Sequence, residues 1–246
     1  QTPQIPNGPQ AGYPSVIKDS AERRANAERE WRRMLDAYAV AQTPPDLYPI
    51  TYTPRSLLGV SGGIKIINTA NPDPLVLREA AKVFIDRWRD LIGADPSTLS
   101  LKEVDDSSTV KRYTYGQAGY PFPVAGNYGE MTIVLGQDGQ LMQMDDRFIP
   151  VVEVPLRPTL EREAVRQRFV GRTFTYGDLA GREQRVQIAS ADEVKVERLV
   201  VLPVEKGDSI EVRLAWQVTA GRSLAWTVYL DAVNGEELRV VQNFNT

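Results

Sequence analysis

One segment of the chain has the spacing of a hydrolase nucleophile. Residues 59–63 read Gly-Val-Ser-Gly-Gly, a G-x-S-x-G pattern in which Ser61 would attack a carbonyl carbon. That chemistry needs a histidine base, a preceding strand and a following helix. The chain has no histidine, Pro54 lies just upstream, and residues 64–67 (Ile-Lys-Ile-Ile) are strand-like. We therefore interpret the segment as a glycine loop; a serine–lysine dyad with Lys65 has no other support in the sequence.

The composition excludes the commonest catalytic side chains. The 246 residues contain neither histidine nor cysteine, so Ser-His-Asp sites, Cys-His sites and the zinc motifs built from these residues cannot form. A hydrophobic content of 42% is nevertheless that of a globular chain that can bury a core. We expect a protein that binds or organises a partner, with no enzyme activity, no metal and no cofactor.

Two pairs of neighbouring aspartates are the remaining candidates for metal binding or acid–base catalysis. They are Asp105-Asp106 and Asp145-Asp146. A calcium loop needs several oxygens at fixed spacing, and adjacent side chains on an extended chain point to opposite sides. Both pairs are interpreted as turn or solvated-edge residues. An enzyme that uses carboxylates alone stays open as an alternative.

The charge pattern argues against nucleic acid and membranes as partners. The chain has 29 lysines and arginines against 32 aspartates and glutamates, a net charge of −3 with both signs mixed. Arginines gather in residues 23–33, but they are interleaved with acidic residues, which is typical of a solvated helix face. No run approaches the roughly 18 apolar residues that a membrane span needs. We expect a protein partner.

The N-terminal part is predicted to be an arm followed by a helix. Four prolines favour an extended arm over residues 1–17, although a floppy tail is the alternative. A helix is predicted from about Ser20 to Gln42, with Asp19 and Glu22 in a capping-box arrangement. Four more prolines indicate a linker over residues 43–56. The start without Met is compatible with a removed secretion signal, so we expect a secreted or extracytoplasmic bacterial protein.

The remainder reads as helices followed by antiparallel strands. A helix is predicted from Asp73-Pro74 to Gly93, and a second, capped by Thr159, runs to about Val170. Asp138-Gly139 and Asn234-Gly235 are hairpin signals. Apolar and polar residues alternate cleanly over 210–219. Strands are predicted at about 99–104, 110–116, 130–136, 140–144, 194–204, 209–220, 224–232 and 237–243.

The C-terminal strands carry a resemblance to a known family. Residues 214–218 (Leu-Ala-Trp-Gln-Val) and 226–238, with Asp231, Ala232, Gly235 and Glu236 in an Asp-Ala-x-x-Gly-Glu pattern, resemble the PepSY-type end of thermolysin-like propeptides. Pro123-Val-Ala-Gly126, the strand at 131–135, Asp138-Gly139 and Leu141 look like the fungalysin/thermolysin propeptide module, although the glycine before Val-Pro-Val is not reproduced. The resemblance covers about residues 70–246; an unrelated α+β meander is the alternative.

The resemblance implies an α+β fold of two helix-plus-antiparallel-meander modules of cystatin/PepSY-like type. An extended Pro-rich arm (1–17) and an amphipathic helix with its Pro-rich linker (18–56) precede a propeptide-like module (57–155) and a PepSY-like module (156–246). It also implies a non-catalytic module that inhibits or chaperones a metallopeptidase, or binds another cell-envelope protein. The alternative is a structural subunit of an extracellular assembly or filament that self-associates through residues 1–42.

Aromatic side chains supply the candidate partner-binding residues. Tyr120 and Phe122 lie in a Tyr-Pro-Phe-Pro loop between two expected strands, where rings are harder to bury; a folded-back loop is the alternative. Phe244 follows the last expected strand, and in a separated propeptide it would approach the peptidase cleft; a frayed strand end is the alternative. The four tryptophans lie on apolar stripes and are predicted to pack in cores: Trp31, Trp88, Trp216 and Trp226.

Overall fold

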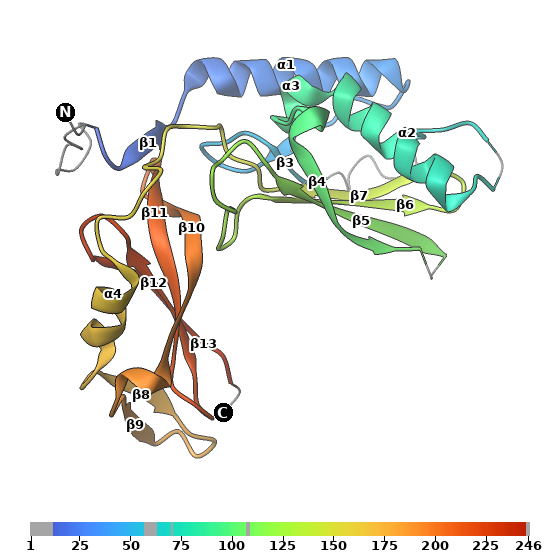
Figure 1. Ribbon diagram of the computed structural model, residues 1–246. Coiled ribbons are helices and arrows are strands. Elements are labelled where there is room, and N and C mark those ends of the chain that lie inside the picture. Colours follow the sequence, from blue (N-terminus) through green and yellow to red (C-terminus); the bar gives the residue numbers. More distant parts are fainter. Residues whose placement is uncertain (1–11, 57–62, 70, 107–108, 245–246) are drawn as a thin grey trace, which may run out of the picture. The chain divides into compact units, whose positions relative to one another are not determined.

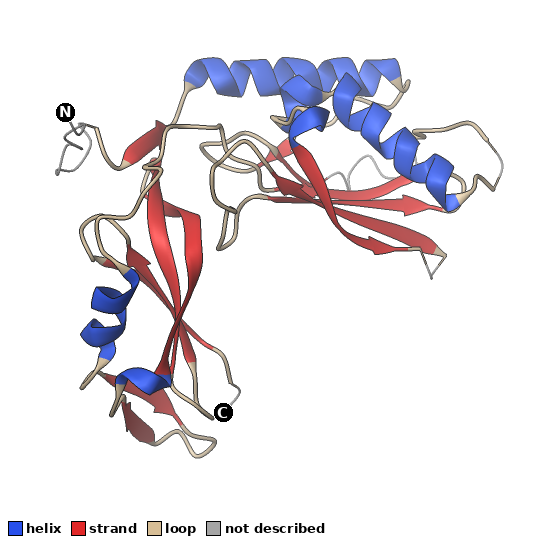
Figure 2. Ribbon diagram, in the orientation of Figure 1, coloured by secondary structure: helices blue, strands red, loops and turns tan. Residues whose placement is uncertain are grey.

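The computed structural model describes residues 12–56, 63–69, 71–106 and 109–244, which divide into two compact units (Figure 1). The terminal unit contains residues 12–15, 153–204 and 211–244, so it joins the start of the described chain to its end. The central unit contains residues 16–152 and 205–210. Each unit combines helices with antiparallel strands, which confirms the predicted α+β class (Figure 2). The four-segment division stays a prediction.

The central unit begins with the long helix α1 (Ala21–Ala37). Ser20 caps it, because its extended backbone lets the hydroxyl accept a 3.2 Å hydrogen bond from the Arg23 N–H. The predicted start at about Ser20 is therefore right, but the cap is Ser20 and not the predicted Asp19, and the predicted end at Gln42 is wrong. The helix stops at Ala37, and Ala39 adopts a left-handed φ of 53° that a helix cannot continue through.

Two further helices follow in the central unit. Asp73 caps α2 (Pro74–Arg87) by accepting a 2.8 Å hydrogen bond from the Leu75 N–H, as predicted. The short helix α3 (Arg89–Ile92) continues after a break and ends at Gly93, whose φ of 69° is accessible to glycine without strain. A 3₁₀ turn, η2 (Pro96–Thr98), leads into the sheet. Nowhere in the described ranges is a helix both long and apolar enough to cross a membrane.

Four strands form the sheet of the central unit. They pair as an antiparallel meander in the order β4 (Leu99–Asp105), β5 (Val110–Gln117), β6 (Glu130–Gly136) and β7 (Leu141–Asp146). The predicted linker over residues 43–56 is wrong in one respect, because it contains a small hairpin of β2 (Asp46–Leu47) and β3 (Pro54–Ser56).

The core of the central unit lies between the helices and one face of this sheet (Figure 2). Strand residues two apart reach the same face, so Tyr113, Tyr115, Met131 and Ile133 all enter the core. They meet a helical stripe whose largest members are buried: Trp31, Met34, Leu35, Leu77, Phe84, Ile85 and Trp88. The predicted core positions of Trp31 and Trp88 are confirmed by exposures of 2% each.

The terminal unit is a second sheet with one helix, α4 (Arg162–Phe169). The strands β11 (Ser209–Ala220), β12 (Trp226–Asp231) and β13 (Glu237–Gln242) pair antiparallel in this order, and β10 (Val194–Lys206) pairs with β11. Trp216 and Trp226 are buried here, which confirms their predicted core positions. The strand β1 (Ser15–Lys18) also pairs with β11, so the last residues of the predicted arm form a strand; residues 1–11 lie outside the described chain.

Two details of the terminal unit differ from the sequence prediction. Thr159 does not cap α4: the helix starts at Arg162, because the N–H groups of Thr159 and Leu160 both donate to the Ala232 carbonyl, at 2.9 Å each. An unpredicted hairpin of β8 (Thr173–Gly177) and β9 (Glu183–Gln187) follows the helix, with a 3₁₀ turn, η3 (Ala191–Glu193), after it.

Candidate functional site

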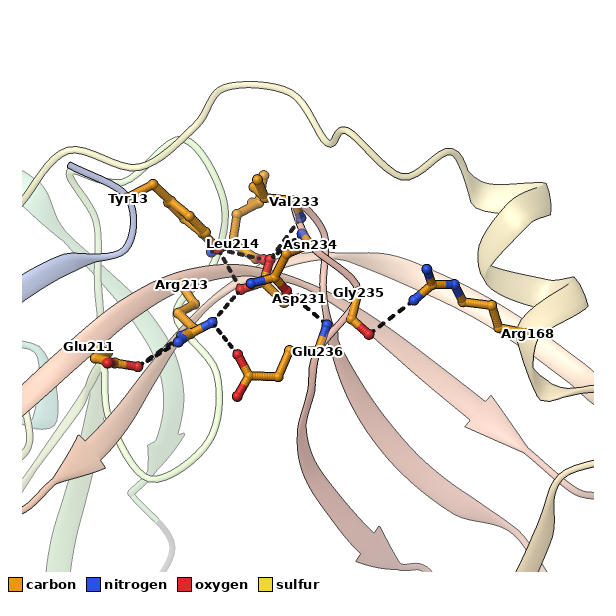
Figure 3. Close-up of polar contacts among 10 residues, drawn as sticks. All are labelled: Tyr13, Arg168, Glu211, Arg213, Leu214, Asp231, Val233, Asn234, Gly235 and Glu236. Atoms are coloured by element: carbon orange, nitrogen blue, oxygen red, sulfur yellow. Dashed lines mark hydrogen bonds and ion pairs between the residues drawn. The ribbon is translucent and has the colours of Figure 1, made fainter. Parts of the chain in front are cut away.

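Arg213 is a charged residue buried in the sheet of the terminal unit. The alternation in β11 predicts it on the wetter face, but only 7% of its surface is exposed. Three carboxylates surround its guanidinium (Figure 3). Its Nη2 lies 2.7 Å from Glu211 Oε2, and its Nη1 lies 2.9 Å from Asp231 Oδ2 and 2.8 Å from Glu236 Oε2. These pairs supply the compensation that a buried cation requires.

Asp231 ends β12 and is fully buried. Its Oδ2 binds Arg213 and also accepts a 2.9 Å hydrogen bond from the Tyr13 hydroxyl. Its Oδ1 accepts the backbone N–H groups of Val233 and Asn234 at 2.8 and 3.1 Å. Each carboxylate oxygen therefore accepts two hydrogen bonds: Oδ1 from the following turn, and Oδ2 from Arg213 and Tyr13. We call Arg213, its three carboxylates and the Tyr13 hydroxyl the charged centre.

The turn after β12 explains the residue types of the Asp-Ala-x-x-Gly-Glu pattern. Gly235 has a φ of 77°, a conformation that favours glycine, and Ala232 is fully buried. The Ala232 N–H donates to the Leu214 carbonyl at 2.8 Å, and Asn234 Oδ1 accepts the Glu236 N–H at 2.8 Å. The carboxylate of Glu236 then forms an ion pair with the guanidinium of Arg213. The pattern builds a turn that positions two carboxylates on one arginine.

Tyr13 brings the start of the described chain to this centre (Figure 3). Its hydroxyl donates to Asp231 Oδ2, accepts the Leu214 N–H at 3.1 Å, and lies 3.4 Å from the Leu214 carbonyl oxygen. Burial raises the pKa of the Tyr13 hydroxyl, and the negative charge of Asp231 raises it further. The hydroxyl stays protonated near neutral pH and acts as a donor.

The centre is suited to hold a hydroxyl group rather than to move a proton. Burial alone lowers the pKa of Arg213, but its hydrogen bonds to Glu211 and Asp231 outweigh burial and raise that pKa above its ordinary value. Neither Arg213 nor Tyr13 changes its charge near pH 7. Among the described residues, no group of three or more acidic side chains is placed to hold a metal ion.

The sequence does not identify this centre as a site, although Asp231 and Glu236 belong to the Asp-Ala-x-x-Gly-Glu pattern. Arg213 is the one cation on the cleanly alternating stretch 210–219, and Tyr13 is the only aromatic residue in the proline-rich segment 1–17. Either exception could have indicated a special role. Glu211 shares a strand face with Arg213 and could have been assigned from the alternation. Asp231 and Glu236 could not be assigned, because only the register of β11 and β12 brings them to Arg213.

Tyr120 and Phe122, which the sequence predicts to contact a partner, lie in the loop between β5 and β6 of the central unit. The Tyr120 hydroxyl donates to the Pro150 carbonyl at 2.8 Å and accepts the Val152 N–H at 3.2 Å, and burial raises its pKa. The ring of Phe122 is half-buried. Their contact with a partner stays a prediction.

Phe244, the third predicted partner-binding residue, packs against other rings of the terminal unit. Its ring lies edge-on to Tyr176 and to Trp226, with centroid distances of 5.2 and 5.1 Å. Phe174 stacks on Trp226, with a centroid distance of 4.6 Å and an angle of 9° between the planes. The hairpin β8–β9 therefore attaches to the sheet through aromatic contacts that include Phe244.

The remaining sequence candidates have different outcomes. The G-x-S-x-G segment lies outside the described residues apart from Gly63. Asp106 accepts a 3.0 Å hydrogen bond from Tyr113, and Asp145 accepts one of 2.9 Å from Tyr48. The solvated-edge role predicted for Asp146 is wrong: it is fully buried, its Oδ1 accepts the N–H of Phe148 at 3.0 Å, and burial raises its pKa well above the ordinary value.

Comparison with known proteins gives structural neighbours but no family. No protein-family model matches the chain, and a search of curated proteins finds no significant match. Among solved structures, the chain is similar to the Bacillus megaterium YpeB C-terminal domain, with 14% sequence identity and a TM-score of 0.36. The similarity covers 78% of this chain and 73% of that one.

Proposed function

We propose that the chain is a non-catalytic binding module of propeptide type that acts on a protein partner outside the cytoplasm. Its partner in this proposal is a metallopeptidase, which it inhibits or helps to fold. The two units would correspond to a propeptide-like module and a PepSY-like module, each with helix and antiparallel sheet. The observation that carries the proposal is the open edge of β4 in the central unit.

The strand β4 lies at the end of its sheet. Within the described residues it pairs with β5 and with no other strand. The unpaired backbone groups of an edge strand can accept an extended segment of another protein. Leu101 and Val104 add apolar side chains that are 40% and 38% exposed. Their register partners are the core residues Tyr115 and Tyr113, so both lie on the helix side of the sheet.

The usual protection of an edge strand is weakened at this position. Lysine on an edge normally blocks pairing with another chain. Here Lys102 Nζ is bound to Glu130 Oε1 at 2.8 Å, on the strand beyond β5. Its side chain runs so close to Gly116 that a Cβ there would lie 2.4 Å from Lys102 Cε. The ammonium group is thus directed across the sheet, away from the open edge.

The partner segment would be extended, with apolar side chains opposite Leu101 and Val104 and a basic residue beside Glu103. Such a segment gains backbone hydrogen bonds from the edge and specificity from the side chains. A bulge at Lys102 limits the pairing to a short segment, because it interrupts the regular register between Leu101 and Glu103.

Inhibition of a thermolysin-like peptidase tests the proposal. We expect the full chain to slow peptide hydrolysis at micromolar concentrations. The double variant Leu101→Lys/Val104→Lys is expected to inhibit about 10-fold less, since truncating or charging interface anchors costs above about 1 kcal/mol. The matched control, Leu75→Lys/Val83→Lys, changes apolar residues on α2 that are 57% and 67% exposed and should inhibit like the original chain. Absence of inhibition, or equal inhibition by the edge variant, would contradict the proposal.

A further inference from the structure

We propose that the charged centre of the terminal unit is a peptide-binding site that recognises a tyrosine hydroxyl, and that it accepts residues 12–15 of a second copy of this chain in place of its own. We define the tyrosine-binding site as the backbone N–H and C=O of Leu214 together with Asp231 Oδ2, which Arg213 holds. This inference does not depend on the β4 edge, which belongs to the central unit.

The site distinguishes tyrosine from phenylalanine by its hydrogen bonds. The hydroxyl donates to Asp231 Oδ2 at 2.9 Å and accepts from the Leu214 N–H at 3.1 Å. A phenylalanine ring fills nearly the same space but leaves the Leu214 N–H and one carboxylate contact without a partner. Unpaired buried polar groups cost roughly 1–3 kcal/mol, so the loss of the hydroxyl should weaken binding by about 10-fold or more.

The site is built without any contribution from the N-terminal segment. Asp231 is oriented by the N–H groups of Val233 and Asn234 and by the guanidinium of Arg213. Arg213 is in turn fixed by Glu211 and Glu236. All these groups come from residues 211–236. The site therefore keeps its geometry when the tyrosine leaves, as expected of a binding site that is already organised before its ligand arrives.

The N-terminal segment is held by the Tyr13 hydroxyl, by Ser15 and by the pairing of β1 with β11 that begins at Ser15. Ser15 Oγ also donates a hydrogen bond to the Glu153 carbonyl, at 2.6 Å and exposed to solvent. Gly12 is exposed, and a Cβ on it would meet no atom within 4 Å. The same contacts can form between two copies, so a segment that leaves its own copy can occupy the site of another. Since every copy carries both the segment and the site, exchange of the identical element links two copies.

A peptide-binding experiment on the full chain tests recognition of the hydroxyl. The protein is the variant Tyr13→Phe, whose own segment lacks the hydroxyl. The probes are two labelled synthetic peptides of residues 7–15, one with the natural sequence and one with phenylalanine in place of tyrosine. Fluorescence anisotropy should show at least about 10-fold tighter binding of the tyrosine peptide. The control protein Tyr13→Phe/Tyr229→Phe, altered at a half-buried residue of β12 outside the site, should bind like the single variant.

Light scattering after size-exclusion chromatography tests exchange between copies. The natural chain should associate as its concentration rises, excess tyrosine peptide should return it to monomers, and Tyr13→Phe should associate much less. A dimer would indicate reciprocal exchange and a ladder of larger species an open chain; both support the proposal. Equal affinity for the two peptides would overturn recognition of the hydroxyl. A natural chain that stays monomeric at its highest soluble concentration would overturn exchange, whatever the peptides do.

Discussion

Replacing Asp231 by asparagine keeps the shape of the side chain and removes its charge. The carboxylate uses both oxygens as acceptors, one for the two N–H groups of the turn and one for Arg213 and Tyr13. An asparagine offers one oxygen and one NH₂ group. In either orientation the NH₂ faces groups that themselves donate hydrogen bonds, so two contacts are lost on one side.

The magnitude follows from these contacts. Hydrogen bonds to charged groups contribute about 1.5–3 kcal/mol each, and removing one partner of a buried ion pair costs about 3–5 kcal/mol. Glu211 and Glu236 remain beside Arg213, so its positive charge is still neutralised. We therefore expect Asp231→Asn to lower the free energy of unfolding of the terminal unit by about 3 kcal/mol, the lower end of that range.

Hydrogen exchange measured by mass spectrometry localises the effect. Protection should fall in β11 and β12, while β5 and β6 of the central unit stay close to their original protection. Asp192→Asn is the matched control, because that carboxylate is 88% exposed and makes one 4.0 Å ion pair; it should change stability by less than about 0.5 kcal/mol. A loss below about 1 kcal/mol in Asp231→Asn would refute the assignment of four contacts to this carboxylate.

Three further substitutions test separate features. Burial raises the folded-state pKa of Asp146 above its unfolded value, so the original chain loses stability as pH rises above about 4 and this carboxyl group must ionise. Asp146→Asn removes that cost and should therefore be more stable than the original chain above about pH 4. Urea unfolding at several pH values measures the difference in the free energy of unfolding. Gly235→Ala should destabilise the terminal unit by about 1–2 kcal/mol, because φ is 77° and a Cβ would meet the Arg168 guanidinium; thermal unfolding measures the loss. Phe244→Ala should cost about 1–2 kcal/mol through its two edge-on ring contacts and increase hydrogen exchange in β8 and β9.

Each of these has a distinct control. Asp178→Asn is the control for Asp146→Asn, because hydrogen bonds from Arg182 lower the pKa of Asp178 and the effect on stability has the opposite sign. Asp178→Asn should be less stable than the original chain at neutral pH, and the difference should shrink as pH falls. Gly177→Ala should have a smaller effect than Gly235→Ala, since its Cβ would meet nothing within 4 Å. Unchanged exchange in β8 and β9 after Phe244→Ala would show that the ring does not hold the hairpin.

The strongest sequence patterns predicted the structure well where local rules decide it. The alternation over 210–219 became β11, and the Asn234-Gly235 signal fell in the turn between β12 and β13. Both depend on neighbours in the chain, so residue types alone carry them.

The missed elements depend on distant contacts. The hairpin of β8 and β9 has ordinary strand residues, and the stacking of Phe174 on Trp226 ties it to the sheet. The alternation of apolar and polar residues predicts Arg213 on the more exposed face of the sheet. Its burial depends on ion pairs with Asp231 and Glu236, which belong to the next strand and the turn after it. The Tyr13 contact spans 201 and 218 residues, beyond the reach of any local pattern.

The long separation in sequence between Tyr13 and its partners also determines when this contact can form during synthesis. Tyr13 leaves the ribosome 201 residues before Leu214 and 218 before Asp231. The central unit takes most of its residues from the single stretch 16–152 and can begin to fold while the rest is being made. Tyr13 can make its contacts only after β11 and β12 have been synthesised, so a chain shortened from the C-terminal side to before Asp231 leaves the N-terminal segment without its binding site.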